Sequence, residues 1–395
     1  MSRWPDKYVI GLTGNISTGK SLVRKMLEHL GAFGIDADGL TAQAMSKRAP
    51  AYQPVLETFG NWILNEAGEI NRQSLGKVVF ADPEALAKLE AIVHPIVRGA
   101  IHTLVGRATQ KVVVIEAIKL FESGLADECD AVWVVDAPED LQLDRLVTKK
   151  GLSAVEASQR MAAQGPQSDK IARADVVIRN TGSFEQPWAR VQEEWAAITG
   201  VEEEPEEEVA VEVPEEPAAP AVAVAPADIS LDDLAIERGG PGDAQKIADF
   251  INEMRKDGKV LTSTDVLMAF GQKAYFLATS TGMVVGLAGW QVENLITTVD
   301  EFYLRSGVPP TRIVAGLIDH IEDASAQLQS EVSFLFVAND LPGDTVQHFI
   351  DAGYEAGNVE DVKVQVWREA ASALQPPDTR MLTKRLREDR VLKPI

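Results

Sequence analysis

Residues 14–21 read Gly14-Asn15-Ile16-Ser17-Thr18-Gly19-Lys20-Ser21, which matches the pattern G-x-x-x-x-G-K-[S/T]. An apolar, strand-like run, Tyr8–Leu12, precedes this stretch, and a helical pattern, Leu22–Leu30, follows it. Glycines let backbone N–H groups converge on phosphate oxygens, and the N-terminus of the following helix adds a positive dipole end. The stretch therefore predicts a P-loop that binds the phosphates of a nucleotide.

The residue types in the loop predict ATP and Mg²⁺ as its ligands. The Lys20 ammonium is expected to reach the β- and γ-phosphates, and the Ser21 hydroxyl is expected to bind Mg²⁺. The residues expected to contact the nucleotide are Gly14, Asn15, Ile16, Ser17, Thr18, Gly19, Lys20, Ser21 and Leu22.

An acidic stretch, Gly34-Ile35-Asp36-Ala37-Asp38, lies one helix further along the chain. In a parallel sheet Asp36 would leave the C-terminal end of the second strand, beside the phosphate loop. A carboxylate there can accept the proton of an attacking hydroxyl, so the sequence predicts phosphoryl transfer with Asp36 as general base. The alternative is that Asp36 or Asp38 only caps the helix that starts near Gly39.

Around these motifs, apolar runs alternate with helical patterns, which indicates a parallel α/β sheet. The predicted strands are Tyr8–Leu12, Gly34–Ile35 with its neighbours, Val112–Ile115, Ala131–Val135 and Val176–Ile178.

The later part of the chain has the pattern of a mixed α+β domain. A hairpin is predicted from Ala274–Ala278 and Val284–Trp290, which flank Ser280-Thr281-Gly282. Helices are predicted near Ala244–Met254 and Ile313–Ala324, and a strand near Val332–Val337.

Between the two parts, residues 201–230 are rich in Glu, Pro and Ala and contain no Lys or Arg. Such a segment repels itself and lacks packing groups, which predicts an extended, disordered linker that lets two domains move independently. The alternative is that the acidic run docks a basic partner. The predicted organisation is a first domain at 1–200, a linker at 201–230 and a second domain at 231–395.

Composition limits the classes of partner. The formal net charge of −22 argues against nucleic acids and anionic membrane surfaces, because their phosphates would be repelled. No window approaches the roughly 20 apolar residues of a membrane span. The single cysteine, Cys129, cannot form an internal disulfide, so we expect a soluble protein in the reducing cytoplasm.

Several motifs of the first domain occur in the order and spacing of dephospho-coenzyme A kinases, from about Tyr8 to Gly182. They are Gly11-Leu12-Thr13-Gly14, Ile35-Asp36-Ala37-Asp38, Asn71-Arg72-x-x-Leu75, Leu89–Pro95, Val134-Val135-Asp136, Gln142-x-x-Arg145, Gln164 and Ala174–Asn180. The domain is therefore identified as resembling this family. The resemblance implies a P-loop kinase with helical lid and acceptor regions. It also implies transfer of the γ-phosphoryl group of ATP to the ribose 3′-hydroxyl of dephospho-coenzyme A, the last step of coenzyme A biosynthesis.

The resemblance also assigns roles to single residues. Asp36 would be the general base and Arg145 the lid arginine, although Arg145 could instead be a solvated arginine on a helix face. Arg72 and His94 match positions in the acceptor-binding region, and Asp38 is a further acceptor candidate. The alternatives are that Asn71-Arg72 is only a helix start and that His94-Pro95 is only a helix-breaking turn.

The sequence departs from the family at positions in the loop and near the acceptor. Asn15, Ser17 and Leu22 replace two glycines and a threonine of the usual loop. Lys119 stands beside the acceptor pocket in a segment that is usually apolar, so it is a candidate for acceptor binding. Arginines common in the family are replaced by Ala42 and Gln167, and we hypothesise that Lys119 and Lys170 restore the lost positive charge.

The second domain resembles the acyl-CoA N-acyltransferase (GNAT) fold more faintly. Its nearest equivalent of the pyrophosphate-binding loop, Arg312–Leu317, has Ala315 and Leu317 where the fold's motif calls for small positions, usually glycine. We therefore expect a non-catalytic sensing or interaction domain that binds an acyl-CoA or a protein partner, with a working acyltransferase as the alternative.

Two other functions stay open for the whole chain. One is a different small-molecule kinase of the nucleoside-monophosphate type, if Lys119 and Ala42 reshape the acceptor pocket. The other is a regulatory protein that binds nucleotide without turnover, against which the presence of Lys20, Ser21 and Asp36 argues.

Overall fold

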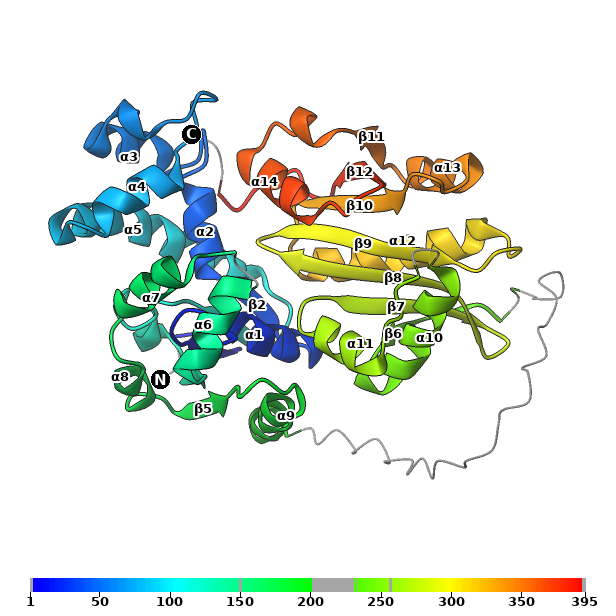
Figure 1. Ribbon diagram of the computed structural model, residues 1–395, viewed down its shortest axis with the longest axis horizontal. Helices are drawn as coiled ribbons and strands as arrows, with labels where there is room; N and C mark the ends of the chain where they lie inside the picture. Colours follow the sequence, from blue (N-terminus) through cyan, green and yellow to red (C-terminus); the bar gives the residue numbers. More distant parts are fainter. Residues whose placement is uncertain (1–2, 149–150, 201–230, 232, 256–257, 393–395) are drawn as a thin grey trace.

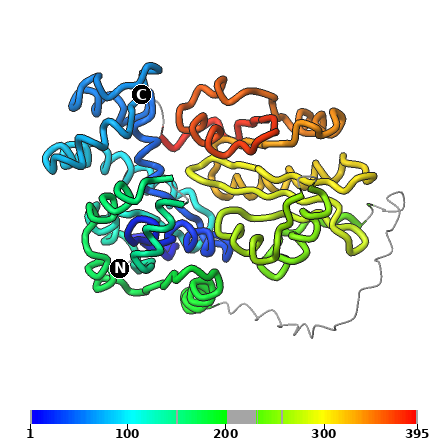
Figure 2. Tube along the Cα trace, viewed as in Figure 1, coloured from blue at the N-terminus to red at the C-terminus, as the bar shows by residue number. Residues whose placement is uncertain are grey.

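The computed structural model describes residues 3–148, 151–200, 231, 233–255 and 258–392. The first domain, blue to green in Figures 1 and 2, lies beside the second domain, yellow-green to red. The predicted linker at 201–230 lies outside the described residues.

The first domain is built on a parallel sheet. Within the described residues this sheet has five strands in the order β2-β3-β1-β4-β5. Their bounds are β1 Tyr8–Thr13, β2 Phe33–Asp36, β3 Val112–Glu116, β4 Ala131–Asp136 and β5 Val176–Arg179. Every adjacent pair is parallel, so the predicted strands and the predicted α/β class are confirmed.

Helices connect these strands and cover the sheet. They are α1 Lys20–His29, α2 Ala37–Ala44, α3 Tyr52–Phe59, α4 Arg72–Val79, α5 Pro83–Arg107, α6 Glu139–Thr148, α7 Ala154–Ala162, α8 Gln167–Ile171 and α9 Glu185–Thr199, with short 3₁₀ turns at Asn61–Ile63 and Ala126–Glu128. Helices α3 and α4 stand apart from the sheet, α5 packs both against them and against the sheet, and α9 packs against α1 (Figure 1).

One of the alternatives considered for this region was wrong. His94-Pro95 does not break a helix, because α5 continues through Pro95 from Pro83 to Arg107. Proline removes one backbone hydrogen bond, but Val93, Val97 and Ile101 are buried in the core on both sides of it. Burial of this apolar face offsets the lost bond and keeps the helix intact.

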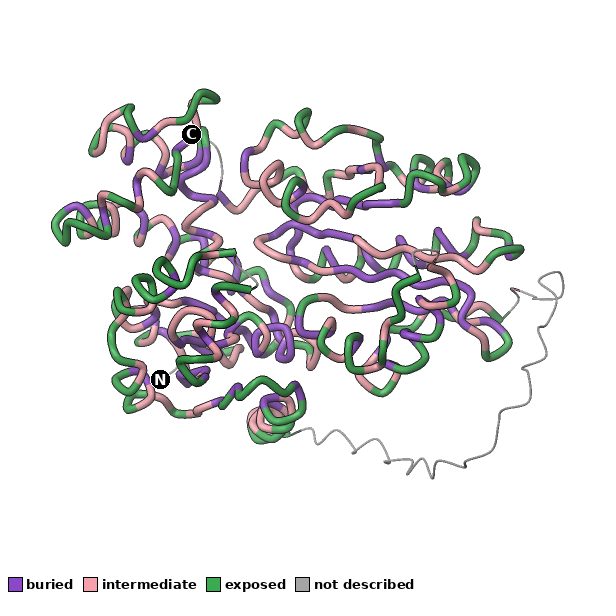
Figure 3. Tube along the Cα trace, viewed as in Figure 1, coloured by how far each residue is buried: buried purple, intermediate pink, exposed green. Residues whose placement is uncertain are grey.

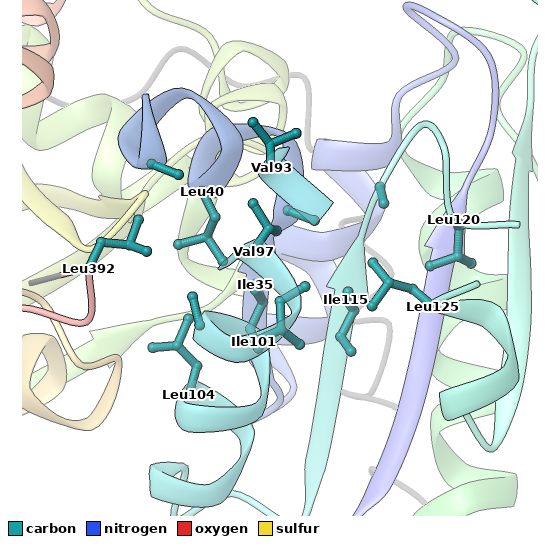
Figure 4. Packing of buried hydrophobic residues seen from close by; sticks show 14 of the residues in the cluster. Ile35, Leu40, Val93, Val97, Ile101, Leu104, Ile115, Leu120, Leu125 and Leu392 are labelled. Atoms are coloured by element: carbon teal, nitrogen blue, oxygen red, sulfur yellow. The ribbon is translucent and has the colours of Figure 1, made fainter. Parts of the chain in front are cut away.

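The apolar core of the first domain lies between α5 and the sheet. Figure 4 shows Ile35 and Ile115 from neighbouring strands packed with Val97 and Ile101 of α5. In Figure 3 the strands of the sheet are largely buried, whereas the outer faces of the helices are exposed. This packing fixes the strand ends that carry Asp36 and Glu116.

The second domain is built on a mixed sheet. Within the described residues this sheet has seven strands in the order β11-β12-β10-β9-β8-β7-β6. Their bounds are β6 Ala235–Gly239, β7 Ala274–Ser280, β8 Met283–Glu293, β9 Ile296–Leu304, β10 Val332–Ala338, β11 Glu355–Gly357 and β12 Thr379–Arg385. Strands β9 and β10 are parallel and the other neighbours are antiparallel, which confirms the predicted α+β class.

Helices of the second domain pack on this sheet. They are α10 Ala244–Met254, α11 Ser263–Phe270, α12 Pro310–Gln327, α13 Gly343–Asp351 and α14 Gln365–Leu374, with 3₁₀ turns at Pro241–Asp243 and Val359–Asp361. The predicted hairpin is present as β7 and β8, and its turn residues Thr281 and Gly282 both have positive φ.

Direct contacts join the two domains. Arg24 pairs with Glu293, Arg72 with Glu369, and Glu69 with Arg368. Near the C-terminus, Leu392 is buried in the core of the first domain, beside Leu40 and Leu104 (Figure 4). The structure therefore differs from the expectation of two independently moving domains, because polar and apolar contacts between them are extensive.

The described helices include none that is both long and apolar enough to cross a bilayer.

Candidate active site

The P-loop connects β1 to α1, as its sequence context predicts. Gly14, Ser17 and Gly19 have φ of 150°, 58° and 101°, in the region that side chains rarely adopt. A Cβ at Gly14 would lie 2.4 Å from the Val135 carbonyl oxygen, so this glycine is required by space as well as by conformation. Of the residues that replace family glycines, Ser17 and not Asn15 takes the left-handed conformation.

Side chains of the loop fold back on the loop itself. Lys20 is buried and donates from Nζ to the Asn15 carbonyl oxygen at 3.1 Å. Thr18 donates from Oγ1 to the same oxygen at 3.0 Å. These bonds hold the Lys20 ammonium against the loop, where phosphate oxygens would meet it.

Two glutamines from the segment around α8 accept hydrogen bonds from loop amides. The Ile16 N–H donates to Gln164 Oε1 at 2.7 Å, and the Asn15 N–H donates to Gln167 Oε1 at 2.9 Å. Gln167 also donates from Nε2 to the Val135 carbonyl oxygen at 2.9 Å. Gln167 stands where the family resemblance led us to expect an arginine, and its amide oxygen accepts the hydrogen bond of the Asn15 N–H, which an arginine side chain could not accept.

Arg145 reaches the loop from α6. Its Nη1 donates to the carbonyl oxygens of Ser17 at 3.1 Å and Thr18 at 3.3 Å, and its Nη2 donates to Asn180 Oδ1 at 3.0 Å. Asn180 in turn donates to the Thr18 carbonyl oxygen at 2.9 Å. The structure thus places Arg145 at the phosphate loop, in contrast to the alternative of a solvated helix-face arginine.

Asp36 ends β2 and is also the N-cap of α2. Its Oδ1 accepts a hydrogen bond from the Gly39 N–H at 2.9 Å, so the capping alternative describes a real contact. Burial and the neighbouring Glu116 carboxylate raise the pKa of Asp36 to about 7, against opposing effects of Arg24 and the Gly39 N–H. A carboxylate with this pKa is suited to accept a proton near neutral pH, in addition to capping the helix.

Glu116 is a site residue that the sequence interpretation missed. It ends β3, where it is the register partner of Asp36 on one side and of Leu12 on the other. Its Oε1 accepts a hydrogen bond from Ser21 Oγ at 2.8 Å, and its Oε2 accepts one from Arg24 Nε at 2.7 Å. The sequence could have indicated Glu116, because a carboxylate that directly follows an apolar strand beside a P-loop is typical of the residue that holds Mg²⁺.

The donor set at this point fits Mg²⁺. The ion is usually bound by one or two protein oxygens together with substrate phosphates, and Ser21 and Glu116 supply such oxygens side by side. Among the described residues there is no cluster of three or more carboxylate, His or Cys ligands, so an all-protein metal cage is absent there.

Asp38 lies in the first turn of α2, two residues after Asp36. Its Oδ2 accepts a hydrogen bond from the Ile118 N–H at 3.2 Å. Burial raises the pKa of Asp38, while Lys20 and Lys170 act in the opposite direction. Lys170 is buried and donates to the Ile118 carbonyl oxygen at 2.9 Å, so the structure brings this hypothesised cation to the site.

The acceptor candidates are divided between two places. Lys119 pairs with Glu90 on α5, one turn before His94. Burial lowers the pKa of His94, and the cations of Lys119 and Arg98 add to this effect. Arg72 instead follows the N-cap Asn71 at the start of α4 and pairs at 2.6 Å with Glu369 of the second domain.

The fold and this geometry define a P-loop phosphotransferase that acts on a small molecule. A family model described as dephospho-CoA kinase matches residues 8–186. The chain is 42% identical over 191 residues to the dephospho-CoA kinase of Geobacter sulfurreducens. This alignment covers 48% of this chain and 97% of that protein. It is 41% identical over 197 residues to the dephospho-CoA kinase of Symbiobacterium thermophilum, and this alignment covers 49% of this chain and 82% of that protein. The chain belongs to the dephospho-CoA kinase family.

Solved structures resemble each domain separately. The first is similar to TT1252 from Thermus thermophilus, with 33% identity, a TM-score of 0.45 and coverage of 49% of this chain and 98% of that one. The second is similar to a GNAT-family acetyltransferase from Staphylococcus aureus, with 14% identity, a TM-score of 0.31 and coverage of 39% and 99%.

Proposed function

We propose that this chain transfers the γ-phosphoryl group of ATP to the ribose 3′-hydroxyl of dephospho-coenzyme A and releases coenzyme A, the last step of coenzyme A biosynthesis. Family membership supports this activity, and one observation of the site carries it. Asp36 lies at the end of the strand beside Glu116, which is bonded to Ser21 of the loop, so a base adjoins the phosphate-binding side.

The residues have separate tasks in this reaction. Asp36 accepts the proton of the attacking ribose hydroxyl, since its pKa of about 7 leaves it partly ionised at neutral pH. Lys20 and Arg145 stabilise negative charge on the transferring phosphoryl oxygens. Ser21 and Glu116 hold Mg²⁺, which neutralises charge on the β- and γ-phosphates when it is bound.

The acceptor is proposed to lie between α2 and α5, on the side of Asp38, Lys119 and His94. Lys119 is partly exposed although it pairs with Glu90, so its ammonium is accessible to an anionic acceptor. Arg72 is a weaker candidate, because it pairs with Glu369 of the second domain, whereas Lys119 and His94 lie close to each other beside α5.

For the second domain we propose a non-catalytic role in binding an acyl-CoA or a protein partner. Arg312–Leu317 lies inside the first turns of α12, and Leu317 is buried in the domain core. A bulky core residue at this position supports the interpretation that the pyrophosphate-binding loop is degenerate.

Turnover with product identification tests the proposed reaction. Purified full-length chain is incubated with ATP, Mg²⁺ and dephospho-coenzyme A, and products are identified by mass spectrometry, with AMP and CMP as competing acceptors. Coenzyme A as the main product is expected. Phosphorylation of AMP or CMP in its place would support the nucleoside-monophosphate kinase alternative, and ATP binding without any product would support the regulatory one.

A further inference from the structure

The tip of the β8–β9 hairpin belongs to the second domain but lies against the first. The Val292 carbonyl oxygen accepts a hydrogen bond from Lys25 Nζ at 2.6 Å, and the Asn294 carbonyl oxygen accepts one from Gln43 Nε2 at 2.5 Å. In Figure 1 the ends of β8 and β9 point toward α2 and β2. A crevice beside the tip is lined by residues of both domains, including Asp36, Arg24 and Asn294.

The turn at this tip has an unusual backbone. Its two residues, Asn294 and Leu295, have φ of 51° and 63°, and left-handed conformation is unfavourable for leucine. Leu295 is buried among core residues of the first domain, including Leu40 and Leu104. The contact with the first domain therefore maintains a turn that leucine would otherwise disfavour.

Arg24 connects this tip to the phosphate loop. The guanidinium is buried and donates from Nη2 to Glu293 Oε1 and Oε2 at 2.8 and 2.9 Å. Its Nη1 donates to Glu28 at 2.5 Å, and its Nε donates to Glu116 Oε2 at 2.7 Å. The other oxygen of Glu116 accepts the bond from Ser21, so a continuous chain of contacts runs from Glu293 to the P-loop.

The charges along this series of contacts favour an ionised Glu293. Burial opposes its charge, but Arg24 and Lys25 hold the pKa of Glu293 at about 2. Lys25 also pairs with Glu28 at 2.9 Å, so the cations and carboxylates alternate. If one carboxylate is removed from such a network, a buried cation loses its partner and pairs instead with one of the carboxylates that remain.

We propose that Glu293 is a positioning residue of the kinase site, supplied by the second domain, and this inference rests on the proposed function. While Glu293 occupies Nη2, Arg24 binds Glu116 through Nε alone, and the second Glu116 oxygen stays turned toward Ser21. Without Glu293, the guanidinium is free to bind Glu116 through both oxygens, because paired N–H groups match a carboxylate. Glu116 would then turn away from Ser21 and lose its capacity to hold Mg²⁺.

Glu293→Gln in the full-length chain tests this role, with Glu253→Gln as the matched control. Glu253 accepts from both Nη atoms of Arg305 inside the second domain, so the control removes a similar pair without involving the first domain. We measure kcat, KM for each substrate, and ATP affinity by calorimetry with and without Mg²⁺. For Glu293→Gln we expect kcat and the Mg²⁺-dependent gain in ATP affinity to fall by about 10-fold, as for other residues that orient metal ligands.

Specific outcomes separate a positioning role from a structural one. Glu293→Asp, which keeps the charge, should recover a large part of both losses, and Glu253→Gln should match the wild type. If Glu293→Gln leaves kcat and the Mg²⁺ effect unchanged, or if Glu293→Asp is as impaired as Glu293→Gln, the proposal is overturned. If the wild type makes no coenzyme A, the proposed function fails, whereas the calorimetric comparison still decides the role of Glu293.

Discussion

Asp36 and Glu116 are register partners at the ends of the parallel strands β2 and β3, so two carboxylates meet beside the phosphate loop. Burial and Glu116 raise the pKa of Asp36 to about 7. Protonated Asp36 cannot accept a proton, so activity should fall as the pH drops below about 7. The pH dependence of kcat/KM checks this, because it reports the ionisation of the base in the free enzyme.

Glu116→Gln should move this acid limb to lower pH. The substitution removes a negative charge that raises the pKa of Asp36, so the base stays ionised in more acidic solution. Glu116→Asp, which keeps the charge, is the control and should leave the limb closer to that of the wild type. An acid limb that does not move in Glu116→Gln would mean that another group controls it.

Asp36→Asn should lower kcat by about 10²- to 10⁴-fold, because it removes the general base. Asparagine is a good N-cap, so the start of α2 should be preserved. Asp82→Asn is a matched control, since Asp82 is the N-cap of α5 and its side chain also accepts a hydrogen bond from a backbone N–H of its helix. Product formation measured by mass spectrometry distinguishes the two, and equal activity in both variants would exclude Asp36 as the base.

The same Asp36→Asn variant should be more stable than the wild type above neutral pH. The pKa of Asp36 is raised on folding, so its contribution to stability is present at low pH and is lost as the pH rises through about 7. Replacing the carboxylate should increase the free energy of unfolding at pH 8 by about 1–3 kcal/mol. Urea unfolding at pH 5 and pH 8 measures this, and an equal effect at both values would contradict it.

Arg145→Lys should lower kcat by about 10²-fold, because lysine cannot reproduce the fork that contacts Asn180 and the loop carbonyls. The positive charge is kept, so the test separates geometry from charge. Arg160→Lys on the exposed face of α7 serves as the control. Steady-state kinetics with saturating ATP checks the result, which a wild-type kcat in Arg145→Lys would refute.

Lys119→Leu should raise KM for dephospho-coenzyme A by about 10-fold and leave KM for ATP and kcat unchanged, which is the pattern of lost uniform binding. Lys88→Leu on α5 is the control, because Lys88 also pairs with a glutamate of that helix. A change in KM for ATP alone would place Lys119 on the nucleotide side instead.

Local patterns in the sequence were sufficient for the strands and the loop. The apolar runs around Tyr8, Val112 and Ala131 are almost entirely buried in a parallel sheet, and the P-loop motif determines its own strand and helix context. Glu116 could have been predicted too, because it directly follows one of these runs. Pro95 could not be placed correctly, because burial of α5 overrides a local helix-breaking signal.

The part that could not be predicted depends on contacts between distant residues. Arg24 and Glu293 are separated by 269 positions along the chain, and nothing in the pattern around either residue indicates the other. Glu293 reads as an ordinary charged residue at the end of a strand. Its relation to the P-loop appears only when the second domain is seen beside the first.

The left-handed turn at Asn294 and Leu295 has a consequence for how the chain is made. A ribosome synthesises the residues that surround Leu295, such as Leu40 and Leu104, long before it reaches the hairpin. Because domains generally fold as units during synthesis, the first domain can already offer a finished surface when the hairpin emerges. The last turn of the hairpin would then be templated by the earlier domain, so the order of translation assists the assembly of the later one.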